Sequence, residues 1–145
     1  MKHAITALLR AKGFHCTEQV FCFDGTSNRY VDILAFEPNS TKAYIIDPTV
    51  RFESNEDQDA AVQADKETIY SKCYADLSSK YPQFGRRQFE TIGLWFGARG
   101  VIGRGVSAFW TRFALEPRQL AEIAEKVLLA SMAMVHQHIY SRSSA

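Results

Sequence analysis

The chain has 145 residues, of which 46% are hydrophobic, and this size and composition suit one globular domain with an ordinary core. Its formal net charge is only +1, which excludes bulk positive charge as a means of binding nucleic acid, so any basic surface must be local. No apolar run approaches the roughly 20 residues that a membrane-spanning helix needs, and the sequence therefore predicts no membrane association.

The first predicted elements are a short helix and a strand. Apolar residues recur at helical spacing before Gly13, which predicts a helix over residues 2–12 that ends at a glycine cap. Residues 15–23 alternate in polarity and are rich in β-forming side chains, so a strand is expected there. The run 24–28 contains Gly, Asn and Asp and predicts a turn.

Two short segments, 29–36 and 42–50, are apolar on both faces and are joined by a polar turn. This pattern predicts adjacent central strands of a sheet that is covered on both sides. Each segment carries one aspartate among hydrophobic neighbours, Asp32 and Asp47, and a hairpin would bring the two toward the same end of the sheet. An unpaired carboxylate in such a place costs several kcal/mol unless it lies at a strand end, meets a cation or is protonated.

The rest of the chain predicts a helix over 58–80, a strand over 89–97, a Gly- and Arg-rich segment, and helices over about 105–114 and 117–139. The order α-β-β-β-α-β-α-α predicts one α/β domain over residues 1–145, with a central mixed β-sheet flanked by helices on both sides. The last helix carries a stripe that is expected to pack in the core, formed by Leu120, Ile123, Ala124, Val127, Leu128, Ser131, Met134 and Val135. The three cysteines lie in apolar segments, which predicts reduced thiols.

The two aspartates are candidate metal ligands. Carboxylates on neighbouring strands can share one hard cation, and Mg²⁺ or Mn²⁺ suits the pair Asp32 and Asp47, because Mg²⁺ takes one or two carboxylates together with substrate phosphate. Such an ion activates water and stabilises charge on phosphate. The alternative is structural: each aspartate caps a strand end or pairs with a nearby arginine such as Arg29 or Arg51.

The helix predicted over 58–80 adds two candidates, Lys66 and Tyr70. Lys66 lies within the apolar stripe of this helix, so its ammonium is expected to point inward, and Tyr70 projects beside it one turn later. The stripe is formed by Val62, Ile69, Cys73 and Leu77. The alternative is a lysine whose stem covers apolar surface beside a packed tyrosine.

In this order, the residues resemble the PD-(D/E)XK restriction-like endonuclease domain at the C-terminus of non-LTR retrotransposon polyproteins. The resemblance is carried by the runs 29–36 and 43–53, then by Lys66 and Tyr70, and it covers nearly the whole chain. It implies a restriction-endonuclease-like fold whose catalytic lysine has moved to the helix after the second aspartate, with Thr49 in the usual lysine place.

The sequence departs from the family in that Val31, and not proline, precedes Asp32. The resemblance implies a Mg²⁺-dependent (or Mn²⁺-dependent) endodeoxyribonuclease that nicks DNA to prime reverse transcription, within a larger reverse-transcriptase polyprotein in the nucleus. Its catalytic residues would be Asp32, Asp47, Lys66 and Tyr70. Two alternatives stay open: a catalytically inactive module of the same fold that binds nucleic acid or protein, and a structure-selective nuclease similar to Holliday-junction resolvases, acting as a homodimer.

Several further residues are candidates for binding. Glu18 is a third candidate metal ligand. Glu53 could reach the metal or pair with Arg51, and a structural ion pair is the favoured interpretation. The arginines expected to contact DNA are Arg29, Arg51, Arg99 and Arg104. The last two lie in a glycine-rich segment that enters a helix N-terminus, a place where backbone amides and guanidinium groups bind phosphate.

Overall fold

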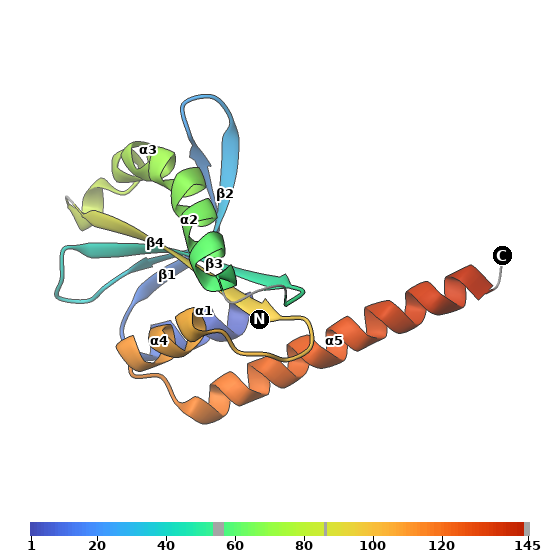
Figure 1. Cartoon of the computed structure of the whole chain (residues 1–145). Helices are drawn as coiled ribbons and strands as arrows, with labels where there is room; N and C mark the ends of the chain where they lie inside the picture. Colours follow the sequence, from blue (N-terminus) through green and yellow to red (C-terminus); the bar gives the residue numbers. More distant parts are fainter. Residues whose placement is uncertain (54–56, 86, 144–145) are drawn as a thin grey trace.

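The computed structural model describes residues 1–53, 57–85 and 87–143 and has the predicted order of elements. It is an α/β structure in which helices flank a four-stranded mixed sheet (Figure 1). The elements are α1 (Lys2–Ala11), β1 (His15–Phe23), β2 (Asn28–Phe36), β3 (Lys42–Arg51), α2 (Gln58–Tyr70), the 3₁₀ turn η1 (Ser71–Cys73), α3 (Tyr74–Lys80), the 3₁₀ turn η2 (Pro82–Phe84), β4 (Gln88–Gly97), α4 (Arg104–Arg112) and α5 (Pro117–Ser143).

The strands lie in the order β1-β2-β3-β4. β2 is antiparallel to both of its neighbours, and β4 is parallel to β3. β2 pairs with β3 only through its second half, from Ile33 opposite Ile46 to Phe36 opposite Ala43. Its first half pairs only with β1, so the β1–β2 hairpin extends beyond the rest of the sheet (Figure 1).

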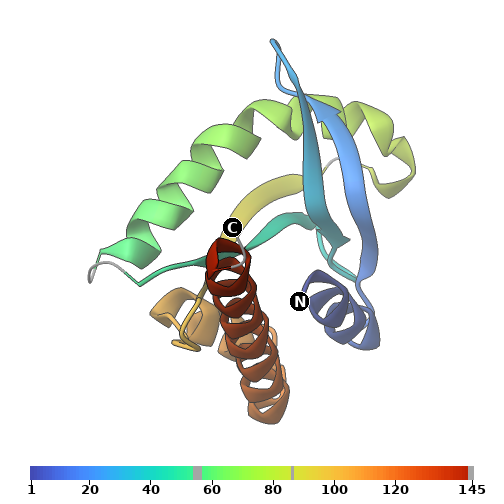
Figure 2. The ribbon, with the colours of Figure 1, turned by 90° about the vertical axis from the view of Figure 1, so that its right-hand side faces the viewer.

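Two apolar cores lie on the two faces of this sheet, with α2 and α3 over one face and α1, α4 and α5 over the other (Figure 2). The larger core joins Ile33 and Ile46 to side chains of α1, α4 and α5. The smaller core joins Leu34 and Ile45 to Tyr70, Cys73 and Leu77. Burial on both faces explains why these strands are apolar along their whole length.

The helix predicted over 58–80 is not continuous, because η1 separates α2 from α3. The break follows Tyr70, which is buried, and the buried Cys73 ends the turn. A 3₁₀ turn changes the rotation per residue, so residues on both sides of it can face the same curved sheet. Figure 2 shows the two helices following the sheet as one bent layer.

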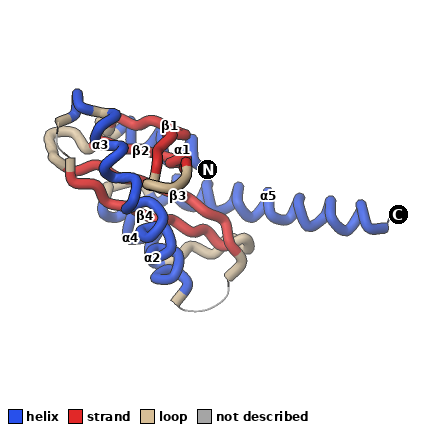
Figure 3. The backbone as a smooth tube through the Cα atoms, turned by 90° about the horizontal axis from the view of Figure 1, so that it is seen from above, coloured by secondary structure: helices blue, strands red, loops and turns tan. Residues whose placement is uncertain are grey.

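The stripe predicted for α5 is buried only in its first half. Val127 is 7% exposed, whereas Met134 is 70% and Val135 is 51% exposed. The second half of α5 extends away from the body (Figure 3), so the same helical pattern meets core at one end and solvent at the other. Across the residues that the structure describes, no helix combines the length and the apolar character that crossing a membrane requires.

Candidate active site

Asp32 and Asp47 meet where β2 and β3 stop pairing. Ile33 lies opposite Ile46, so the next position in the same register places Asp32 opposite Asp47. Asp47 is buried and Asp32 is partly buried. Burial raises the pKa of Asp32, and the charge of Asp47 and a hydrogen bond with its carboxyl group raise it further. The two aspartates therefore lie at the same end of the β2–β3 pairing, as the hairpin predicted.

The Asp47 carboxylate is held by two side chains of α2. Lys66 Nζ lies 3.1 Å from Asp47 Oδ2, and the Tyr70 hydroxyl donates to the same oxygen at 2.9 Å. The Lys66 side chain is only 14% exposed, so the predicted inward direction of Lys66 is confirmed. The Thr49 hydroxyl donates to the other oxygen, Asp47 Oδ1, at 3.5 Å. Asp47 thus pairs with Lys66 and not with an arginine, which was the structural alternative.

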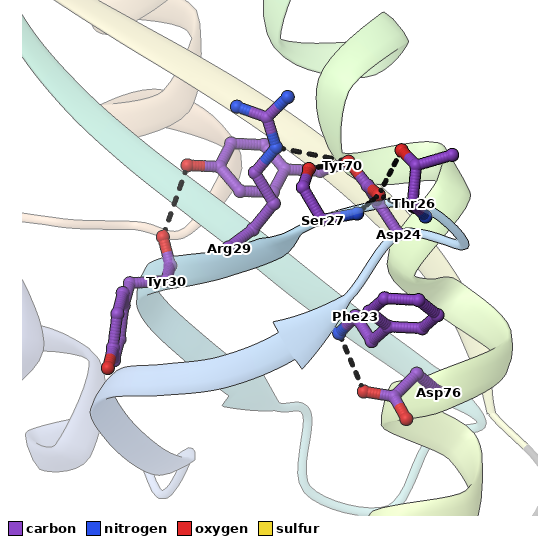
Figure 4. Close-up of polar contacts among 8 residues, drawn as sticks. All are labelled: Phe23, Asp24, Thr26, Ser27, Arg29, Tyr30, Tyr70 and Asp76. Atoms are coloured by element: carbon purple, nitrogen blue, oxygen red, sulfur yellow. Dashed lines mark hydrogen bonds and ion pairs between the residues drawn. The ribbon is translucent and has the colours of Figure 1, made fainter.

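Tyr70 also joins this site to the β1–β2 hairpin. Its hydroxyl lies 3.3 Å from the carbonyl oxygen of Tyr30 (Figure 4). The same hydroxyl donates to Asp47. Burial raises the pKa of Tyr70, and the negative charge of Asp47 raises it further. The phenol therefore stays protonated at neutral pH and acts as a hydrogen-bond donor that fixes the carboxylate.

The Lys66 side chain reaches Asp47 across Gly93, the partner of Asp47 on β4. A Cβ atom at Gly93 would lie 2.9 Å from Cγ of Lys66 and 3.4 Å from the carbonyl oxygen of Val62. The missing side chain therefore opens the path that the lysine takes. Sequence analysis missed Gly93, although a glycine inside an apolar strand indicates close approach by another group.

Gln63 fixes the height of α2 on the sheet. Its side-chain amide donates to the carbonyl oxygen of Thr91 at 2.7 Å and accepts from the backbone N–H of Gly93 at 2.8 Å. These two bonds give partners to backbone groups on the outer edge of β4, beside the position where Lys66 crosses the strand. Because Gln63 lies one turn before Lys66, it is a positioning residue for the ammonium. A single glutamine on a helix gives no signal of such a role in the sequence.

Gly93→Ala is expected to lower the free energy of unfolding by about 1–3 kcal/mol, because the added methyl group must displace the lysine stem or α2. Urea unfolding measures this loss. The matched control is Gly105→Ala in α4, where the nearest atom to the new Cβ, Oδ1 of Asp59, is at an ordinary 3.4 Å, and alanine suits a helix better than glycine. Equal stability of the two variants would contradict the crossing at Gly93.

Asp32→Asn is expected to raise the free energy of unfolding at neutral pH without divalent cations. A raised pKa means that the folded state holds the proton of Asp32 more tightly than the unfolded state, so wild-type stability falls as pH rises above the ordinary value of 3.8. The gain from Asn should disappear below that value, where both states are protonated. Urea unfolding over a range of pH, with a chelator present, measures the difference.

Asp24→Asn is the control, because it is expected to change stability at neutral pH in the opposite direction. Backbone hydrogen bonds from Ser27 and Thr26 lower the pKa of Asp24, so its ionised form stabilises the folded state. Stability should therefore be lost at neutral pH when Asp24 is replaced. A loss of stability in Asp32→Asn at neutral pH, like that of Asp24→Asn, would contradict the crowding of Asp32 against Asp47.

Glu18 lies on β1 opposite Ile33, one position from Asp32. Its carboxylate accepts hydrogen bonds at 2.7 Å from the Thr6 hydroxyl and from Nδ1 of His3. Both partners belong to α1, so these bonds fasten α1 to the sheet. The structure thus binds the carboxylate of this third candidate ligand to α1, and among the described residues it forms no metal-ligand group with the two aspartates.

The four arginines that were expected to bind DNA do not form one surface around the aspartates. Arg29 pairs with Asp24 at the tip of the β1–β2 hairpin, at 3.1 Å (Figure 4). Arg51 pairs with Asp65 of α2 at 3.5 Å. Both arginine side chains stay partly exposed, at 45% and 39%, so each still has surface available for phosphate.

The structure gives Glu53 and the start of α4 other partners than the sequence predicted. Glu53 pairs with Arg99 at 3.0 Å and not with Arg51. The N-terminus of α4 is capped by a carboxylate of the chain itself, because the Arg104 N–H donates to Oδ2 of Asp59 at 2.9 Å. Asp59 therefore fills the place where the sequence predicted bound phosphate, and it comes from α2, which local sequence does not relate to α4.

The carboxyl pair fits a hard cation by its chemistry. Asp32 and Asp47 supply oxygen donors from neighbouring strands. Burial raises the pKa of Asp32 most, and the repulsion from Asp47 that raises it further is one that a cation would relieve. Within residues 1–53, 57–85 and 87–139, no group of three or more His, Cys, Asp and Glu side chains could hold a metal ion. Mg²⁺ needs only one or two carboxylates when water and phosphate complete its shell.

No protein-family model matches the sequence, and no curated protein matches it. Among solved structures, the chain is similar to the crystal structure of a protein of unknown function, AF1548. The two are 12% identical, the match covers 94% of this chain and 97% of the other, and the TM-score is 0.39.

Proposed function

We propose that the protein is a metal-dependent DNA endonuclease of the PD-(D/E)XK type, with a restriction-endonuclease-like fold. One observation carries the proposal: the Lys66 ammonium crosses Gly93 and lies 3.1 Å from Asp47, which lies opposite Asp32 in the strand register. A pair of carboxylates with one ammonium supplies the ligands and the positive charge that hydrolysis of a phosphodiester requires.

In this mechanism Asp32 and Asp47 would hold the cation. Lys66 supplies a positive charge, and Tyr70 keeps the Asp47 carboxylate in place. A hard divalent cation would supply Lewis acidity toward the phosphate and would lower the pKa of a water molecule. The Lys66 ammonium, which lies beside Asp47, would stabilise the negative charge that develops on a phosphate bound at this site. The Tyr70 hydroxyl holds the Asp47 carboxylate in one orientation, so little reorganisation is needed.

The biological role that we propose follows the family resemblance. The nuclease would nick one strand of chromosomal DNA in the nucleus, and the free end would prime reverse transcription by a larger polyprotein to which this chain belongs. Among the alternatives, a module that only binds nucleic acid or protein would not need a lysine kept beside Asp47 at 14% exposure.

The test is nicking of supercoiled plasmid by the purified chain, with Mg²⁺, with Mn²⁺ and with a chelator. We expect open-circular product only when a divalent cation is present. Absence of nicking with both metals, on plasmid and on forked oligonucleotides alike, would overturn the proposal. Nicking that persists in the chelator would overturn the metal-dependent mechanism.

A further inference from the structure

An exposed aromatic pair lies on the β1–β2 hairpin beside the candidate active site. Phe21 and Tyr30 are direct cross-strand partners, with ring centroids 5.6 Å apart and planes at 69°. Phe21 is 41% exposed and Tyr30 is 60% exposed. Their neighbours Val20 and Val31 are buried in the smaller core, so the pair occupies the opposite face of the hairpin.

The position of Tyr30 relates this pair to the proposed chemistry. Tyr30 lies two residues before Asp32, and its carbonyl oxygen is 3.3 Å from the Tyr70 hydroxyl that also binds Asp47. Figure 4 shows the Tyr30 ring turned away from Tyr70, while its backbone is held toward it. The backbone of Tyr30 is thus fixed to the site, and its ring stays free to contact a substrate.

A positive charge lies against this surface. Lys80 Nζ lies 4.6 Å from the centroid of the Phe21 ring. Lys80 also donates to the Phe21 carbonyl at 2.7 Å and pairs with Asp76 at 3.2 Å. An exposed aromatic surface beside a cation is a combination by which proteins hold unpaired nucleotides, with bases stacked on rings and phosphates near positive charge.

We propose that Tyr30, supported by Phe21, is a stacking platform for an unpaired nucleobase next to the phosphate that is cleaved. This inference depends on the proposed nuclease function and specifies its substrate class. The preferred substrate is DNA with unpaired bases beside the cleavage position, such as a fork or a bulge, and not a continuous duplex.

The experiment measures binding separately from cleavage. A forked oligonucleotide with 2-aminopurine in its unpaired arm is titrated with protein in a chelator, beside a fully paired duplex of the same sequence. Stacking quenches 2-aminopurine, and loss of one stacking contact is expected to weaken binding by roughly 5- to 100-fold. We expect Tyr30→Ala to abolish the quenching and to weaken binding of the fork by that factor. Its affinity for the duplex should stay unchanged.

Two control variants complete the test. Tyr30→Phe keeps the ring and should bind the fork like wild type, and Phe52→Ala removes an aromatic residue that is 71% exposed outside the hairpin and should change nothing. Equal binding of fork and duplex by wild type, or an unchanged fork affinity in Tyr30→Ala, would overturn the platform even if the enzyme cuts DNA. Tyr30-dependent binding without any cleavage would support the platform and overturn the nuclease.

Discussion

Asp47→Ala is expected to abolish metal-dependent nicking while leaving DNA binding largely intact. Asp47 contacts the other residues of the site. It follows the last β2–β3 pair on the side of Asp32, and it binds both Lys66 and Tyr70. Its removal takes away one of the two carboxylates proposed to hold the cation, and we expect a fall of at least about 10²–10³-fold in rate. Plasmid nicking and fluorescence anisotropy with labelled DNA measure the two effects.

The same substitution should also destabilise the fold. Lys66 and Tyr70 would lose their shared acceptor at a site where their polar atoms are mostly removed from water, at a cost of about 1–3 kcal/mol. The matched control is Asp65→Ala, which removes an aspartate that is 53% exposed and pairs only distantly with Arg51. Nicking by purified Asp47→Ala at the rate of the Asp65 variant would show that Asp47 is structural.

Lys66→Ala is expected to lower the nicking rate by about 10²–10³-fold, the usual effect of removing one group that stabilises transition-state charge. The structure also indicates how the loss can be reversed. The Thr49 hydroxyl lies 3.5 Å from Asp47 Oδ1, so a longer side chain from this strand position can reach the same carboxylate. Thr49→Lys in the Lys66→Ala background should therefore recover part of the activity.

The Lys66 experiment needs a control for charge alone. Lys72→Ala removes an exposed lysine in the turn that follows α2, with the same change in net charge, and should nick at the wild-type rate. The rescue should need Asp47, so the triple variant that also carries Asp47→Ala should stay inactive. Wild-type nicking by Lys66→Ala would show that the ammonium only packs beside Asp47.

The sequence by itself determined the strands, the short helix α1 and the identity of the central residues. Strand bounds could be predicted because apolar stretches end at turns whose residues favour those turns, such as the run from Asp24 to Ser27, where the Asp24 carboxylate accepts two backbone N–H groups. Asp32, Asp47 and Lys66 could be recognised because a charge inside an apolar pattern is costly and requires a partner.

Only the tertiary structure decided which partner each charge has. The Glu53–Arg99 pair spans 46 positions and the bond from the Arg104 N–H to Asp59 spans 45, and periodicity carries no information at that range. The same limit applies to α5, whose uniform stripe is buried only as far as the sheet extends beneath it. The passage across Gly93 arises because parallel β3–β4 pairing sets that glycine beside Asp47 under α2, and only packing of distant elements creates such a gap.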